Sequence, residues 1–219
     1  MDIFGVNFFL YDLIIESMSE DYMSVLENNF DIVVKKSKFI SNSFFVENES
    51  DIKKKISLVK KLNYDASHHV YAYLLLDGTS KSYDDGEPSG TAGVQVLKVI
   101  NNFNLKNVLI VVTRYFGGTK LGTGGLSRAY FECADLLIKN SKIITKKKCL
   151  KVAIEVTYKE YDKIVKNSDF KIIETIFLLN VNLLIAVENS KIDEFKNKIE
   201  CMFSRKLDFS IKGEEYFDF

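Results

Sequence analysis

Glycine and proline are concentrated in one stretch of this 219-residue chain. Eight of the eleven glycines and the only proline lie between Asp84 and Tyr130. Both residue types destabilise the interior of helices and strands, so their concentration predicts loops with special backbone geometry or close approaches between segments. Each of the two glycine-rich loops leads into an apolar run with helical spacing, and such loops commonly present backbone N–H groups to phosphate. Function is therefore to be sought in this stretch.

Around this stretch the sequence predicts alternating strands and helices. Val108–Tyr115 is almost continuously apolar, which is typical of a strand buried on both faces. Asp77–Gly90 is polar and predicts a long loop. The other expected elements are strands at Ile32–Lys36, Phe39–Glu47 and His69–Leu76, a helix capped by Ser50, a helix at Thr91–Phe103 with Val94, Leu97 and Ile100 on one face, and a helix at Leu126–Lys139.

The pattern changes after Asn140, where glycine is absent until Gly213 and the basic run Lys146–Lys148 suggests a boundary. From there the expected order is strand, helix, strand, strand, helix, strand, which is the βαββαβ order of ferredoxin-like domains. We therefore predict an α+β protein with domains at residues 23–145 and 146–219. Residues 1–22 are expected to be an extension, either disordered or the product of an upstream start site.

Composition limits the classes of function. Thirty basic and thirty acidic residues cancel, yet between Gly86 and Phe131 five basic residues accompany only one acid. The three cysteines form no CxxC pair, which argues against a zinc site or a disulfide framework and fits a reduced, cytoplasmic protein. The apolar run Phe8–Ile15 is too short for a membrane span and contains Asp12. We expect no membrane association, no metal and no cofactor.

The second glycine loop, Gly117–Gly125, follows the apolar strand and precedes a helix, so helix N-terminal amides can meet an anion there. It lacks the Lys–Ser/Thr pair of a phosphate-binding P-loop and the third glycine of the dinucleotide-binding fingerprint. The alternative is a tight packing corner between strand and helix. The residues expected to bind phosphate or nucleic acid are Arg114, Tyr115, Gly117, Gly118, Lys120, Gly122, Gly124, Gly125 and Arg128.

The first loop carries three carboxylates, Asp84, Asp85 and Glu87, which are candidates for acid–base chemistry or for holding Mg²⁺. The alternative is a turn in which Ser89 or Thr91 caps the following helix. His69 is a further catalytic candidate, because it begins a strand and can face the acidic loop. A purely structural hydrogen-bonding role is the other possibility for this histidine.

The strings DDGEPSGTAG (Asp84–Gly93) and VVTRYFGGTKLGTGGLSRAY (Val111–Tyr130) resemble the signature of the YigZ/IMPACT family of small cytoplasmic proteins. The resemblance runs from about Lys35 to the C-terminus. It implies an N-terminal domain of the superfamily shared by a small-subunit ribosomal protein, the ribonuclease P protein and elongation factor G domain IV. It also implies a C-terminal domain similar to elongation factor G domain V, a tandem that suggests contact with RNA or the ribosome.

Two hypotheses follow. The first is a non-enzymatic binding protein that acts around translation and contacts RNA, the ribosome or a translation-related protein through the basic glycine-loop face. The resemblance favours it, since the eukaryotic IMPACT relatives regulate translation, although through a partner-binding domain without a counterpart in this sequence. The second is an enzyme acting on a phosphorylated or nucleotide-like small substrate, with the three carboxylates opposite Lys120 and Arg128. A deep pocket with converging acids would favour the enzyme, and a shallow basic groove would favour nucleic acid.

Overall fold

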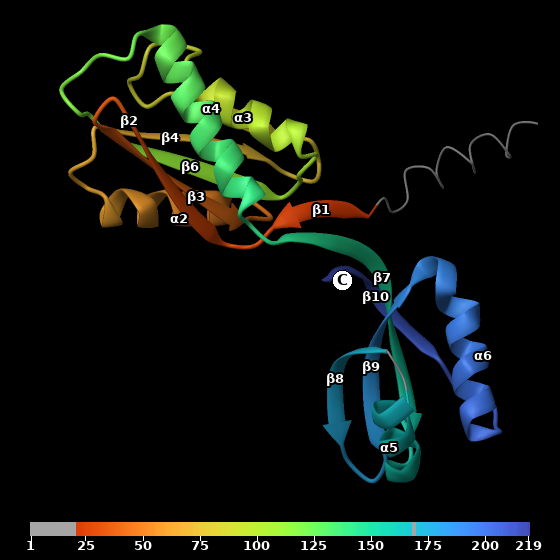
Figure 1. Cartoon of the computed structure of the whole chain (residues 1–219). Coiled ribbons are helices and arrows are strands. Elements are labelled where there is room, and N and C mark those ends of the chain that lie inside the picture. Colours follow the sequence, from red (N-terminus) through yellow and green to blue (C-terminus); the bar gives the residue numbers. More distant parts are fainter. Residues whose placement is uncertain (1–20, 168–169) are drawn as a thin grey trace, which may run out of the picture. The chain divides into compact units, whose positions relative to one another are not determined.

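The computed structural model describes residues 21–167 and 170–219, so residues 1–20 of the expected extension lie outside the described residues. The described chain divides into two compact units, which we call the N-terminal unit, Tyr22–Thr145, and the C-terminal unit, Lys146–Phe219 (Figure 1). None of the helices in the described residues has the length and apolar character needed to cross a bilayer.

The N-terminal unit is built on an antiparallel sheet with the strand order β2-β3-β6-β4-β5. The central strand β6 (Val108–Tyr115) is buried along nearly its whole length, which confirms the strand predicted from its apolar run. The remaining strands are β1 (Tyr22–Val25), which forms a bridge to Leu105, β2 (Asn28–Val34), β3 (Ser37–Phe45), β4 (His68–Leu74) and β5 (Ser80–Tyr83).

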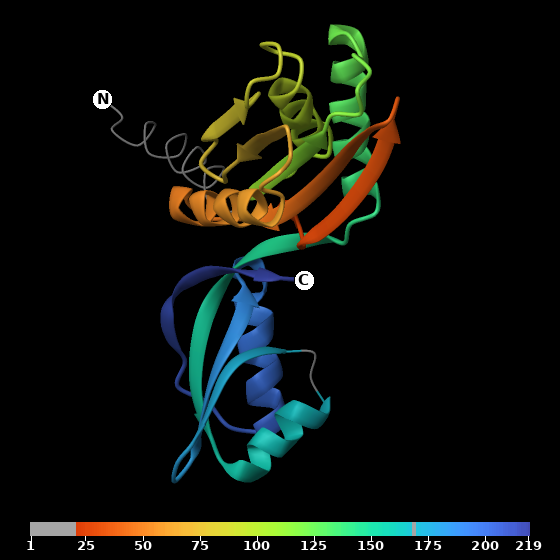
Figure 2. The ribbon, with the colours of Figure 1, turned by 90° about the vertical axis from the view of Figure 1, so that its left-hand side faces the viewer.

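Helices cover both faces of this sheet (Figures 1 and 2). On one face, α3 (Gly93–Asn102) and α4 (Thr123–Lys139) enclose the larger core, which includes Val112 and Tyr130. On the other face, α2 (Glu49–Leu62) packs through Ile52 and Val59 on a smaller apolar cluster. Removing apolar side chains from water on both faces is the main driving force for this arrangement.

Several local predictions for this unit are corrected by tertiary contacts. The cap of α2 is Asn48, whose side chain accepts a 3.0 Å bond from the Asp51 amide, and not Ser50. The expected long loop contains β5, because its polar residues pair with β4 at the sheet edge. The buried face of α3 contains Val96 and Val99, whereas Val94 is exposed.

The C-terminal unit has the βαββαβ order predicted from the sequence. Its strands follow the order β10-β7-β9-β8 and all neighbours are antiparallel. Figure 2 shows both helices on the same side of the sheet, where they enclose a separate core. The elements are β7 (Ile143–Val156), α5 (Tyr158–Asn167), β8 (Lys171–Phe177), β9 (Val181–Glu188), a short 3-10 turn (Asn189–Lys191), α6 (Ile192–Phe203) and β10 (Ser210–Asp218).

The basic run Lys146–Lys148, interpreted from sequence as a link between domains, lies inside strand β7. Its charges are compatible with a strand because acids from two neighbouring strands face them. Lys146 pairs with Asp218 and Lys148 with Glu214, both of β10, while Lys147 pairs with Glu188 of β9.

Thr157 and Glu160 fix the start of α5. The Glu160 carboxylate accepts a 2.8 Å bond from the Thr157 amide, which is the reciprocal arrangement of a capping box. The guanidinium of Arg205 also donates to this carboxylate, and this contact lowers the pKa of Glu160 to about 2.

Candidate nucleic-acid interface

The glycine loop begins at the end of β6, where Gly117 lies against the turn that joins β2 and β3. The amide of Gly117 donates a 3.1 Å bond to the Ser37 hydroxyl. A Cβ added at Gly117 would lie 2.0 Å from the carbonyl carbon of Lys36, so no side chain fits there. At this position the packing-corner interpretation explains the glycine.

Apart from Leu121, which packs partly against the larger core, the rest of the loop is open to solvent, and it contains left-handed backbone. Gly118 and Gly122 have φ values of 82° and 71°, which favour glycine. Gly122 is the N-cap residue of α4, which begins three residues earlier than predicted. Gly124 differs from these, because its φ is helical and a Cβ would meet nothing within 4 Å.

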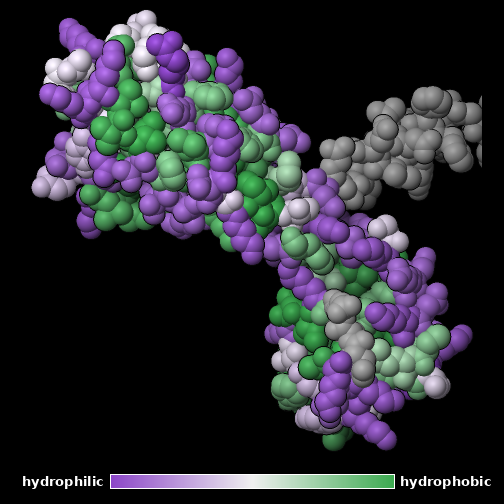
Figure 3. Space-filling model, viewed as in Figure 1, coloured by the Kyte–Doolittle hydropathy of each residue, from purple (hydrophilic) through white to green (hydrophobic). Residues whose placement is uncertain are grey.

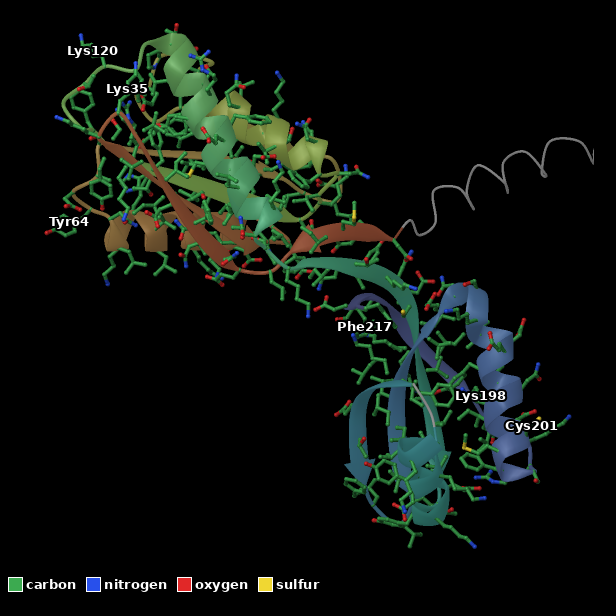
Figure 4. The ribbon with its side chains drawn as sticks, viewed as in Figure 1. Lys35, Tyr64, Lys120, Lys198, Cys201 and Phe217 are labelled. Atoms are coloured by element: carbon green, nitrogen blue, oxygen red, sulfur yellow. The ribbon has the colours of Figure 1, made fainter. Side chains whose placement is uncertain are left out.

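The first turn of α4 presents free backbone donors. No acceptor for the amides of Thr123, Gly124 or Gly125 lies within the part of the chain that the structure describes, and this turn has neither a side-chain cap nor an acidic residue. Lys120 is exposed in the loop just before it, as Figure 4 shows. The N-terminal amides and helix dipole favour an anion at such a position.

Arg128 is exposed on the outer surface of α4. It lines a shallow groove of about 320 Å³ together with Gln95 of α3, Phe131 and the acidic Glu132. The sequence predicted that this arginine acts together with the glycine loop. In the structure it lies one to two turns after the first residue of α4.

Arg114, expected to bind phosphate at the surface, is only 5% exposed. Its guanidinium donates a 2.7 Å bond to Glu87 Oε1, and the same oxygen accepts a 2.7 Å bond from the Tyr130 hydroxyl. The guanidinium also lies 5.5 Å from the ring centroids of Phe39 and Phe116. Arg114 therefore holds the base of the loop in place and is not available to an external phosphate.

The buried group formed by Glu87, Arg114 and Tyr130, which we call the buried triad, joins three elements. Arg114 Nε is buried and has no hydrogen-bond partner within the described residues. Burial, followed by the charge of Glu87, raises the pKa of the Tyr130 hydroxyl far above its usual value, so this hydroxyl remains a donor. Sequence reasoning missed Tyr130 because its helical spacing indicated only a core residue.

The three carboxylates of the first loop do not converge. Asp84 accepts bonds from the amides of Gly90, Ala92 and Gly93, and so caps α3. The turn-and-cap interpretation describes this loop well, although Asp84 is the cap in place of Ser89 or Thr91.

Asp85 accepts a 2.6 Å bond from the His69 amide and lies 3.6 Å from the Lys60 ammonium, while Glu87 belongs to the buried triad. Among the described residues no group of His, Cys, Asp or Glu is arranged to hold a metal ion.

The two histidines have different surroundings. The ring of His69 donates through Nε2 to the carbonyl of Asn63 at 3.0 Å, which is the structural role considered from the sequence. Its Nδ1 faces the acidic loop as expected, 3.8 Å from Asp85 Oδ2. The ring of His68 donates through Nδ1 to the carbonyl of Asp85 at 2.8 Å. Its Nε2 lies 3.8 Å from Glu87 Oε1, so His68 and not His69 is the histidine beside the buried triad. The pairing of His68 with Arg114 on adjacent strands brings them to one face.

Tyr115 and Phe116 also differ. The Tyr115 hydroxyl bonds to Asn63 and Asp65, both at 3.2 Å, and its ring is partly buried. Phe116 is 50% exposed.

Figure 3 shows mainly hydrophilic and near-neutral residues at the end of the N-terminal unit that carries the glycine loop, bordered by a hydrophobic patch. Between Pro88 and Phe131 the chain contains no acidic residue.

Comparison with known proteins identifies relatives over most of the chain. Residues 35–138 match the model of the Impact N-terminal domain family. The IMPACT family member YvyE of Bacillus subtilis is 34% identical over 90% of this chain and 93% of its own length. The IMPACT family member YigZ of Escherichia coli is 30% identical, over 78% of this chain and 87% of its own length. A crystal structure of a hypothetical protein, 27% identical, superposes with a TM-score of 0.60 over 87% of this chain and 96% of that one.

Proposed function

Because the chain belongs to the IMPACT family, we propose that it is a non-enzymatic, cytoplasmic binding protein that acts around translation and contacts RNA through its glycine-loop face. By this face we mean the exposed loop Gly118–Gly122, the first turn of α4 and Arg128. We also propose that its two units are similar to elongation factor G domains IV and V.

The observation that supports the proposal most is the first turn of α4. Its amides have no acceptor in the described residues, and the exposed Lys120 precedes Thr123 by three residues in the chain with no acidic residue between them. Backbone amides and lysine ammonium groups bind phosphate oxygens without regard to base sequence. The competing enzyme hypothesis needs Asp84, Asp85 and Glu87 to converge, whereas each carboxylate binds a different protein group.

The proposal predicts RNA binding that depends on salt and on Lys120. We expect fluorescence anisotropy of a labelled RNA to show an affinity that falls linearly with salt on a log–log plot, with a slope of about −0.7 for each single-strand phosphate neutralised. Lys120→Ala should weaken binding and make the slope shallower by about 0.7.

Lys139→Ala is the matched control, because Lys139 lies on the last turn of the same helix and pairs with Asp135. It removes the same charge and should leave the slope unchanged. Absence of RNA binding at low salt, or equal effects of the two substitutions, would refute the proposal.

A further inference from the structure

Three connections of the N-terminal unit meet at the end that carries the glycine loop. The Phe116 amide donates a 3.2 Å bond to the Ser67 hydroxyl, which ties the loop to the α2–β4 connection. Gly117 packs on the backbone of Lys36 in the β2–β3 turn. Figure 4 shows Lys35, Tyr64 and Lys120, one from each connection, at this same end. We call the surface formed by these three connections the loop end.

Two aromatic rings are exposed on the loop end. Tyr64 is 85% exposed, so its ring removes almost no apolar surface from water. Phe116 is 50% exposed, and its ring lies over the buried Arg114 guanidinium with its backbone fixed by Ser67. A ring held in this way, with half its surface open, is a platform on which another flat group can stack.

The β2–β3 turn adds two cations in an unfavourable backbone conformation. Lys35 and Lys36 have φ values of 46° and 69°, and they connect the paired residues Val34 and Ser37. A two-residue turn with both φ values positive favours Asn–Gly, and lysine adopts this conformation only at an energetic cost. The backbone geometry of the turn does not favour lysine at either position, and both charges are available to a partner.

The charge of the loop end is positive. Lys35, Lys36 and Lys120 are exposed and form no ion pair within the described chain. The one acid on these connections is Asp65, which accepts the Tyr115 hydroxyl. Exposed rings interspersed with unpaired cations match a strand that alternates bases with phosphates.

We propose that the loop end binds a single-stranded segment of RNA, with bases stacked on Phe116 and Tyr64 and phosphates near Lys35, Lys36 and Lys120. This inference rests on the proposed RNA-binding function and adds the substrate class. In an RNA duplex the bases are stacked on one another and their faces are not available to protein rings. The exposed rings therefore select single strands, whereas lysines alone would bind either form.

The test compares a labelled, unstructured RNA of ~12 nucleotides, within the range that such surfaces cover, with the duplex of the same sequence. We expect the full chain to bind the single strand at least about 10-fold more tightly, because stacking on two rings is lost in the duplex. Phe116→Ala and Tyr64→Ala should each weaken single-strand binding by about 10-fold while leaving duplex binding and the salt slope unchanged.

Tyr64→Phe and Phe116→Tyr are matched controls that retain the rings and should bind as the unmodified chain does. Tyr64 keeps the test independent of folding, because its exposed ring supports no core. Equal affinity for single strand and duplex, or alanine variants within about 2-fold of the unmodified chain, would overturn this inference and leave the proposed RNA binding intact. Failure to bind either form would overturn both.

Discussion

Glu87 Oε1 is the acceptor on which the buried triad depends. It receives hydrogen bonds from Arg114 and Tyr130, and the Glu87 side chain is 3% exposed. A buried charge whose partner is removed destabilises a fold strongly, because the remaining ion has no water to solvate it. These residues lie in the two strings that carry the family resemblance, and here they join strand, loop and helix beneath the glycine loop.

Truncating one member of the buried triad should therefore destabilise the protein. We predict that Glu87→Ala lowers the free energy of unfolding in urea by about 3 kcal/mol, since it leaves the Arg114 charge buried alone. Tyr130→Phe, which retains the ring and the ion pair, should lower it by only about 1 kcal/mol.

A double-mutant cycle with Arg114→Met checks the cause of this loss. Removing both charges should destabilise less than the sum of the two single changes, because neither ion is left unpaired. Strict additivity would show that the ion pair contributes nothing through its pairing.

At the scale of the element, the connection from β6 to α4 uses glycine for two different reasons. Gly117 is required by close packing against Lys36, and Gly122 by its positive φ before the helix. Gly124 has neither requirement, since it lies in the first turn of α4 with open space at its Cβ position.

This difference gives a matched pair of substitutions. We predict that Gly117→Ala lowers the free energy of unfolding by about 2 kcal/mol or more, because backbone must move to admit the methyl group. Gly124→Ala should leave stability unchanged or raise it by up to about 1 kcal/mol, because alanine favours helix more than glycine does. Thermal and urea unfolding of both variants measure this; a Gly124→Ala variant as unstable as Gly117→Ala contradicts the assignment.

For the whole molecule, the two units have separate cores. The buried clusters of the N-terminal unit use residues up to Ile138, and the cluster of the C-terminal unit uses residues from Val152 to Leu207. Helices of the same unit pack on each core. The boundary at residue 146 and the independence of the C-terminal domain remain predictions.

We predict that residues 146–219 fold without the rest of the chain. The fragment contains every strand and helix of the βαββαβ order except the first residues of β7, but its small core should make it only marginally stable. Dispersed amide resonances in a nitrogen-edited NMR spectrum of the fragment are the expected result. A collapsed spectrum would mean that the fragment needs the N-terminal unit to form its core.

The amino-acid sequence by itself determined those elements whose signals are local. The apolar run of β6, the helical spacing of α4 and the βαββαβ order were all predictable, because hydrophobic periodicity reports directly on burial. The glycines from 117 to 122 likewise marked a loop before a helix, although the helix begins at Thr123 and includes Gly124 and Gly125. Predictions failed where a partner distant in sequence decided the outcome: β5 is a strand because β4 lies beside it, and Lys146–Lys148 form part of a strand because acids of β9 and β10 face them.

The tertiary structure alone decided which charges remain free at the candidate site. Arg114 lies in the apolar strand and Lys120 in the glycine loop, but no local signal identifies the buried partners of the arginine: Glu87 and Tyr130 bind Arg114, and nothing in the described chain pairs with Lys120. Tyr64 and Lys35 carry no motif, and only the meeting of three connections brings them beside the glycine loop. Local patterns specify which segments become loops, whereas long-range packing determines which loops share a surface.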